Sequence, residues 1–149
     1  MSGCCCPSTG PFSPILFFAT STETVTGNLI GAGEVNVLTL GVSSSSPGSH
    51  QVKLDSTVEL TLTTNSSTIN YTILYRLRRS DLGAPLATLQ VDDHNVGNSA
   101  GPVFTRIPNL TWNDIISTSV TYFITIQVVT TSGLATIQAG TRALNAIVF

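Results

Sequence analysis

Residues 69–78, Ile-Asn-Tyr-Thr-Ile-Leu-Tyr-Arg-Leu-Arg, decide the fold of this chain. Apolar and polar side chains alternate along them, with Leu74 as the exception. The apolar set is Ile69, Tyr71, Ile73, Tyr75 and Leu77, and the polar set is Asn70, Thr72, Arg76 and Arg78. Because successive side chains of a β-strand point to opposite faces, the stretch predicts a strand that turns its tyrosines into a core and its arginines outward.

Strand patterns also fill the rest of the chain from Ile15 onward. Further strands are expected within 15–26, 35–40, 52–64, 86–91, 103–110, 120–128 and 136–149, separated by clusters of Gly, Asn, Ser and Pro. No window shows a helical period. About eight strands in this arrangement predict an all-β fold, an antiparallel two-sheet sandwich. A jelly roll is the first choice and an immunoglobulin-like sandwich the alternative. The apolar last strand is expected in a sheet centre or against a neighbouring subunit.

The composition favours a protein that packs against copies of itself. Of the 149 residues only 9% are charged, the net charge is -2, and Lys53 is the single lysine. An ordinary soluble domain carries about 25% charged residues. This charge offers nucleic acid no attraction. No apolar run reaches the length of a membrane span, so neither nucleic acid nor a membrane span is expected.

Residues 1–14, MSGCCCPSTGPFSP, form a flexible leader rich in proline, ahead of a β-sandwich domain at 15–149. The leader holds all three cysteines of the chain, Cys4, Cys5 and Cys6. Adjacent cysteines do not easily form a disulfide with each other, because their Cβ atoms point apart. We therefore expect intermolecular disulfides. A metal site would need spaced cysteines with histidines nearby, so no metal and no cofactor is expected.

Two other groups of residues resemble possible sites, and a third marks an expected corner of the chain. Asp92-Asp93-His94-Asn95 lies in a predicted loop, 92–102, and is interpreted as turn chemistry. Trp112-Asn113-Asp114 is interpreted as a corner. Arg76, Arg78 and Arg79 form a basic patch, with Asp81 or Asp92 expected as partners across the hairpin. No catalytic motif is present in the sequence, and the protein is not expected to be an enzyme.

Two short stretches of sequence, Gly31–Val37 and Arg142–Phe149, carry a resemblance to a known family. Through them the domain Ile15–Phe149 resembles the small jelly rolls of the tumour-necrosis-factor and complement-head type that are found on bacterial spores. The leader resembles the N-terminal cysteine connectors of endospore-appendage subunits. In that family, connector cysteines bond to neighbouring subunits, including to cysteines on the jelly roll. This chain has no jelly-roll cysteine, so pairing would run from leader to leader or from leader to another protein.

The resemblance implies a structural, self-assembling subunit of a spore-surface layer or fibre. Its partners would be copies of itself, in a ring, trimer or filament, and an anchoring spore-coat protein bound through the leader. It would be made in the mother-cell cytosol without a signal peptide and end on the exosporium or an appendage. The alternative is a lectin-like or receptor-binding jelly-roll head at a fibre tip, with its ligand in the loops around Ser43–Gly48 or Asp92–Gly101.

Overall fold

The computed structural model describes residues 13–21, 27–44, 46–97 and 103–149, except the side chains of Asn95 and Val96. These residues form nine β-strands and no helix. The strands are β1 (Ile15–Ser21), β2 (Glu34–Val42), β3 (His50–Thr64), β4 (Thr68–Arg79), β5 (Ala87–Gly97), β6 (Val103–Arg106), β7 (Asn109–Ile116), β8 (Val120–Ser132) and β9 (Leu134–Val148).

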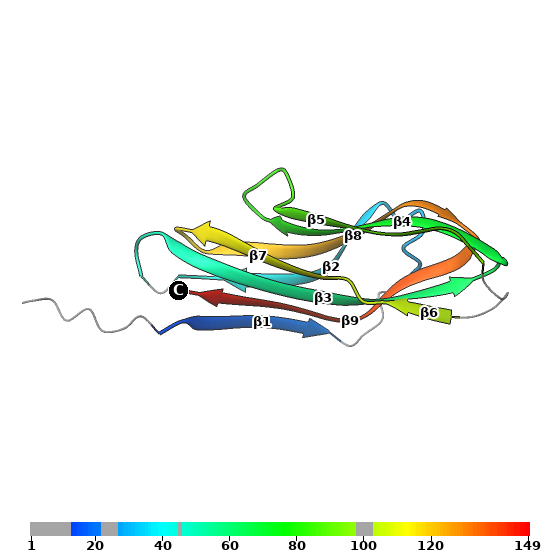
Figure 1. Cartoon of the computed structure of the whole chain (residues 1–149). Coiled ribbons are helices and arrows are strands. Elements are labelled where there is room, and N and C mark those ends of the chain that lie inside the picture. Colours follow the sequence, from blue (N-terminus) through cyan, green and yellow to red (C-terminus); the bar gives the residue numbers. More distant parts are fainter. Residues whose placement is uncertain (1–12, 22–26, 45, 98–102) are drawn as a thin grey trace, which may run out of the picture.

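The strands form two antiparallel sheets that face each other (Figure 1). Sheet A has the order β1-β9-β3, with β6 and β7 both paired to β3, and sheet B has the order β2-β8-β4-β5. The pairs are nested: β1 with β9, β2 with β8, β3 with β6 and β7, and β4 with β5. Such a chain is a long hairpin wrapped into two layers, which is a jelly roll. The predicted jelly roll is confirmed, and the immunoglobulin-like alternative is wrong because there the first strand pairs with the second.

β6 and β7 together make one broken strand beside β3. Residues 103–106 pair with the second half of β3 and residues 109–116 with its first half. Pro108 separates them and has no N–H to donate to a ladder. Its carbonyl still accepts from the backbone N–H of Val58 at 3.2 Å. The expectation of a strand broken around Pro108 is confirmed.

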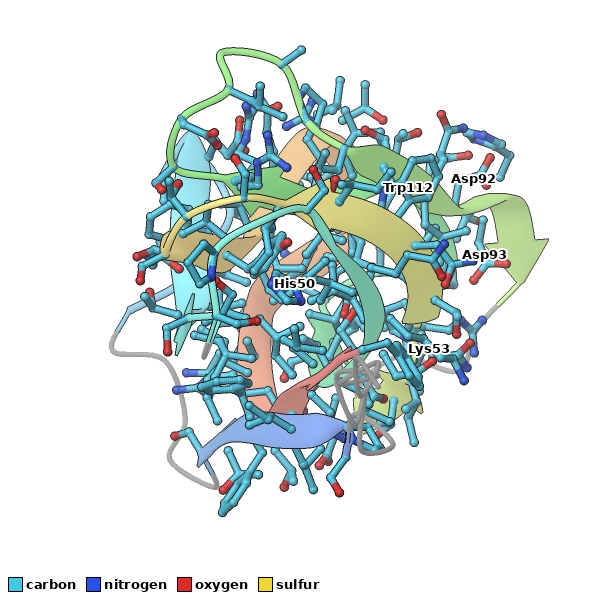
Figure 2. All side chains as sticks on the ribbon, turned by 90° about the vertical axis from the view of Figure 1, so that its left-hand side faces the viewer. His50, Lys53, Asp92, Asp93 and Trp112 are labelled. Carbon is cyan, nitrogen blue, oxygen red and sulfur yellow. The ribbon has the colours of Figure 1, made fainter. Side chains whose placement is uncertain are left out.

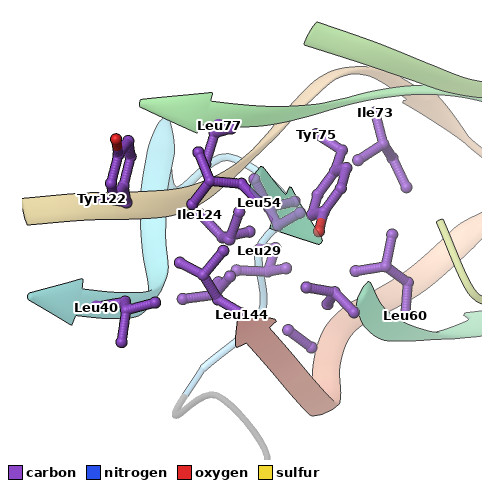
Figure 3. Close-up of a cluster of buried hydrophobic side chains, with 14 of the residues drawn as sticks. Leu29, Leu40, Leu54, Leu60, Ile73, Tyr75, Leu77, Tyr122, Ile124 and Leu144 are labelled. Carbon is purple, nitrogen blue, oxygen red and sulfur yellow. The ribbon is translucent and has the colours of Figure 1, made fainter. Parts of the chain in front are cut away.

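The core lies between the sheets and is built by the predicted alternation (Figure 3). The apolar set of β4 is at most 2% exposed: Ile69, Tyr71, Ile73, Tyr75 and Leu77. β9 lies between β1 and β3, which confirms that the apolar last strand occupies a sheet centre. Ile137, Leu144 and Ala146 of this strand are fully buried.

Two predicted irregular segments are strands. Asp92, Asp93 and His94 belong to β5, so the predicted loop at 92–102 is wrong as far as Gly97, and residues 98–102 lie outside the description. Trp112-Asn113-Asp114 belongs to β7, so the predicted corner is wrong. In both cases an acidic side chain points inward on an edge strand and is neutralised by an arginine, which a strand pattern based on hydrophobicity does not anticipate.

Gly133 makes the reversal from β8 to β9 and has no room for a side chain. Its φ of +75° lies in the left-handed region that favours glycine. A Cβ there would lie 2.2 Å from the carbonyl oxygen of Thr68. The carbonyl of Gly133 also accepts from the N–H of Asn65 at 3.1 Å, which joins this turn to the end of β3.

We expect Gly133→Ala to lower the free energy of unfolding by more than either of two matched variants. Gly31 also has a φ of +75°, but a Cβ added there meets nothing within 4 Å. Gly31→Ala should therefore cost only the strain of the left-handed backbone, about 1–2 kcal/mol. Gly83→Ala has neither problem and should change stability by less than about 0.5 kcal/mol. Urea unfolding of the three variants measures this order. Equal losses for Gly133→Ala and Gly31→Ala would show that the Thr68 contact relaxes freely.

Candidate assembly site

The leader joins the sandwich at one end, beside the end of the last strand. Cys4, Cys5 and Cys6 lie outside the described residues. The chain enters β1 at Ile15, which pairs with Val148, so the start of β1 and Phe149 lie at the same end (Figure 1). Anything bound to or cross-linked by the leader is therefore tethered at this end of sheet A.

The outer face of sheet A exposes large apolar side chains near this end. Leu16 and Phe18 on β1 are 61% and 68% exposed, and Ile115 and Phe149 are 61% and 53% exposed. The strand registers place Leu16 next to Ile147, and Ile147 next to Lys53. Lys53 pairs with Asp55 at 3.5 Å on this face. The sequence analysis missed this surface, although both faces of ILFFATS are apolar and one of them has to be left outside the core.

A shallow hollow of about 380 Å³ lies on the same part of the molecule. It is lined by Gln51, Val52, Lys53, Asn113, Asp114, Ile115 and Phe149. A smaller hollow of about 280 Å³ lies where β2 ends and β8 begins, and is lined by Gly41, Val42, Ser43, Ser80, Ser119, Val120 and Thr121. Both open widely to the surface, so neither encloses a small ligand as an ordinary binding pocket does.

His50 closes this end of the sandwich from inside. Figure 2 shows it near the middle of the end view, between the layers. Its Nδ1 lies 3.2 Å from the carbonyl oxygen of Phe149, and its Nε2 lies 3.0 Å from that of Ser46. A neutral imidazole donates from only one nitrogen. If Nδ1–H donates to the Phe149 carbonyl, Nε2 can accept from the Ser46 hydroxyl at 3.3 Å, and the ring then joins the β2–β3 loop to the end of β9. Within the described ranges no three His, Cys, Asp or Glu side chains are grouped to hold a metal ion.

All three tyrosines point from sheet B toward sheet A, and each hydroxyl has a partner. The Tyr75 hydroxyl donates to Ser56 Oγ at 2.8 Å and that of Tyr122 to Asp114 at 2.8 Å. The Tyr71 hydroxyl donates to Asp93 and accepts from Arg106 Nε at 3.0 Å. Burial raises the pKa of Tyr71 and of Tyr75 to about 12.

The Asp92–His94 stretch is divided between the two faces of β5. Asp93 turns inward to Tyr71 and Arg106. Burial opposes ionisation of Asp93, but these hydrogen bonds and the Arg106 charge outweigh it and lower its pKa. Asp92 lies outward, 3.0 Å from His94 Nε2. In Figure 2 the two labelled aspartates point in different directions. The stretch is therefore part of the sandwich and does not form one cluster of ligands.

The arginines of β4 are paired within the chain. Arg79 contacts Asp81, as predicted, and also reaches Asp114 on sheet A at 2.8 Å. The other predicted partner, Asp92, is not the partner of Arg76 or Arg78. Both of these contact Glu34 on β2 instead.

The hydrogen bond from Arg78 is the largest effect on Glu34 and lowers its pKa, so the carboxylate stays charged. Sequence reasoning missed Glu34 because only the sheet order β2-β8-β4 brings it across to β4. The positive charge of Arg76, Arg78 and Arg79 is thus largely neutralised by carboxylates of the same chain.

The described residues of the two stretches proposed for a binding head do not come together in one site. Ser43–Gly48, with residue 45 outside the description, precedes His50 at the leader end. Gly97 pairs with Thr68 at the other end. Among the described residues, no helix is long and apolar enough to cross a membrane.

Comparisons with known proteins find similarity in structure only. No protein-family model and no curated protein matches the sequence. Among solved structures, the chain is similar to the T13 particle of infectious bursal disease virus (TM-score 0.41, 16% identity, 91% of this chain and 31% of that chain). It is similarly related to the T=1 particles derived from that virus (0.41, 16%, 91% and 32%) and to its VP2 subviral particle (0.41, 14%, 91% and 33%). This chain spans about a third of the length of those chains, and the likeness is too distant to transfer a function.

We expect the tyrosines to titrate late and to couple alkaline pH to unfolding. The pKa of Tyr71 and Tyr75 rises from 10.0 in the reference state to about 12 in the folded chain. The folded state therefore holds protons that the unfolded state releases, so this stability is complete below about pH 10 and is lost as pH rises through about 12.

Absorbance at 295 nm, recorded against pH with and without denaturant, measures both titrations. Tyr75→Phe should remove part of the late titration. Native tyrosines that ionise near pH 10 while the chain stays folded would contradict the buried, bonded hydroxyls.

Proposed function

We propose that this protein is a structural, self-assembling subunit whose copies are joined by disulfides from Cys4, Cys5 and Cys6. The observation that carries the proposal is the separation of roles along the chain. All the thiols lie in the leader, and the leader enters the sandwich beside an exposed apolar face formed by Leu16, Phe18 and Phe149. Large exposed apolar patches mark surfaces that contact other molecules.

The pairing of charged side chains within the chain supports the same proposal. Arg76, Arg78 and Arg79 are paired within the chain, to Glu34, Asp81 and Asp114. Surface repulsion between copies is correspondingly weak, because a low net charge promotes association. Asp114 and Arg79, and likewise Asp93 and Arg106, join one sheet to the other, so their function is to hold the sandwich together.

The proposed setting is the surface of a bacterial spore, as an exosporium layer or an appendage. Its support is the resemblance of the leader to appendage connectors. The setting also fits the chemistry, because thiols stay reduced in a cytosol and oxidise once the assembled layer meets an oxidising environment. The disulfide partner is the leader of another copy, with an anchoring coat protein as the second candidate.

Oxidation of the purified chain tests the cross-link. We expect air-oxidised protein to give a ladder of multiples on a non-reducing gel, which reductant collapses to the monomer. The variant with Cys4, Cys5 and Cys6 all replaced by Ser should give no ladder and keep the circular dichroism spectrum of the parent. If the unsubstituted protein stays monomeric on the gel after complete oxidation, the disulfide proposal is wrong.

Extraction of purified spores tests the setting. If the subunit is part of a disulfide-linked surface layer, detergent alone should leave it in the insoluble spore fraction, and detergent with reductant should release it. The triple Ser variant, expressed in place of the parent, serves as the matched control and should be released by detergent alone. Recovery of the parent in the soluble lysate, with none on spores, would contradict the proposed location.

A further inference from the structure

The two long sides of the sandwich are held together by different kinds of hydrogen bond. In the described part of the chain each sheet forms its own ladders, so no ladder joins sheet A to sheet B on either side. The bonds between the sheets are therefore made by side chains and by the segments between strands. The chemical nature of their acceptors decides how each side responds to acid.

The side of β1 and β2 has bonds between the sheets that end on carbonyl and amide oxygens. Arg142 of β9 is buried, and its Nε donates to the carbonyl oxygen of Val37 on β2 at 2.7 Å. Leu29, which precedes β2, donates its N–H to the carbonyl oxygen of Ile137 at 2.9 Å. The Asn28 side chain accepts from the N–H of Ile137, also at 2.9 Å. These oxygens carry no titratable charge, so acid leaves the bonds intact.

On the opposite side, the bonds between the sheets involve two carboxylates. Arg106 of β6 reaches Asp93 of β5, and Arg79 of β4 reaches Asp114 of β7. Arg79 also donates to the carbonyl oxygen of Ile115 at 3.1 Å, so the β7 end keeps a bond that acid does not change. The acid-sensitive end of this side is therefore the contact between β5 and β6.

The contact between β5 and β6 is organised by the carboxylate of Asp93. It accepts from the Tyr71 hydroxyl of β4 and from the Arg106 guanidinium of β6. Arg106 Nε donates to the same Tyr71 hydroxyl at 3.0 Å, and the guanidinium lies 5.1 Å from the centre of the Phe104 ring. The side chains of Asp93 and Arg106 are 24% and 41% exposed, so water and protons reach the pair.

β6 is able to move separately from the rest of sheet A. It is four residues long and pairs with the second half of β3, whereas β7 pairs with the first half. Pro108 lies between β6 and β7 and has no N–H to donate, so the two ladders with β3 are separate. β6 can therefore leave β5 without disturbing the pairing of β7.

We infer that acid separates β6 from β5 before the rest of the sandwich opens, which makes this contact a pH-sensitive device independent of the self-assembly proposed above. The groups that face Asp93 are Tyr71 from β4, Arg106 from β6 and His94 on its own strand. Burial opposes ionisation, but the hydrogen bonds from Tyr71 and Arg106 hold the pKa of Asp93 below its ordinary value of 3.8. The stability from this contact is therefore complete above that value and is lost as pH falls through the lowered pKa.

Hydrogen exchange followed by NMR, on the full chain kept reduced, tests this order of events between pH 6 and pH 2. After correction for intrinsic exchange rates, the protection of the β6 amides should fall at least about threefold at the acid end, the size expected for a partly exposed ion pair. The protection of the β9 amides should keep its value. An equal fall in β6 and β9 would be global unfolding and would overturn the inference, as would unchanged protection of β6 down to pH 2.

Asp93→Asn should reproduce the loss of β6 protection at neutral pH, because it removes the charge and keeps the size of the side chain. Glu34→Gln is the matched control. It also removes a carboxylate paired with arginines, Arg76 and Arg78, but all three residues belong to sheet B, so β6 should stay protected as in the parent. If both variants lower the protection of β6 equally, or neither does, the inference is wrong. The pH series on the parent covers the case in which Asp93→Asn does not fold.

Discussion

The sandwich depends on the reach of three tyrosines across its interior. Tyr71, Tyr75 and Tyr122 all start on sheet B, and their hydroxyls meet Arg106, Ser56 and Asp114 of sheet A. A buried hydroxyl without a partner costs about 1–3 kcal/mol. Sliding one sheet past the other by a residue pair would leave the hydroxyls of Tyr75 and Tyr122 without their partners and would separate Arg106 from Tyr71 and Asp93. Apolar contact alone is not directional, so these bonds define which layers of the two sheets face each other.

The sequence predicts the local part of this arrangement well, because alternation is a local signal. Residues 69–77 turn their apolar set inward as expected, and the break at Pro108 follows from its missing N–H. The strand status of Asp92–His94 and Trp112–Asp114 does not follow. It depends on Arg106 and Arg79, which reach Asp93 and Asp114 only once the sheets are assembled. The Glu34 contacts with Arg76 and Arg78 are of the same kind, since β8 separates their strands.

The candidate site divides in the same way. The cysteine triplet can be recognised from the sequence as a candidate for cross-linking, because the three adjacent thiols have no other cysteine in the chain to pair with. The exposed apolar surface of sheet A cannot be predicted from the sequence, because ILFFATS is apolar on both faces and the pattern alone does not say which face is buried. The pairing of β1 with β9 settles this by turning Leu16 and Phe18 outward. Only then does the exposed apolar surface lie at the end where the chain enters β1.

A non-covalent contact through the exposed apolar face of Leu16, Phe18 and Phe149 and a covalent bond in the leader, as proposed above, would act in sequence. Two thiols that collide only by diffusion oxidise with any accessible partner, whereas tethering on short linkers raises their effective concentration to the millimolar range. Association through that face would therefore select the partner, and oxidation would make the association permanent. Three consecutive cysteines suit this order of events. Their backbone spacing of about 3.8 Å per residue lets one thiol meet its counterpart over a range of leader conformations, so the disulfide needs no fixed leader geometry of its own.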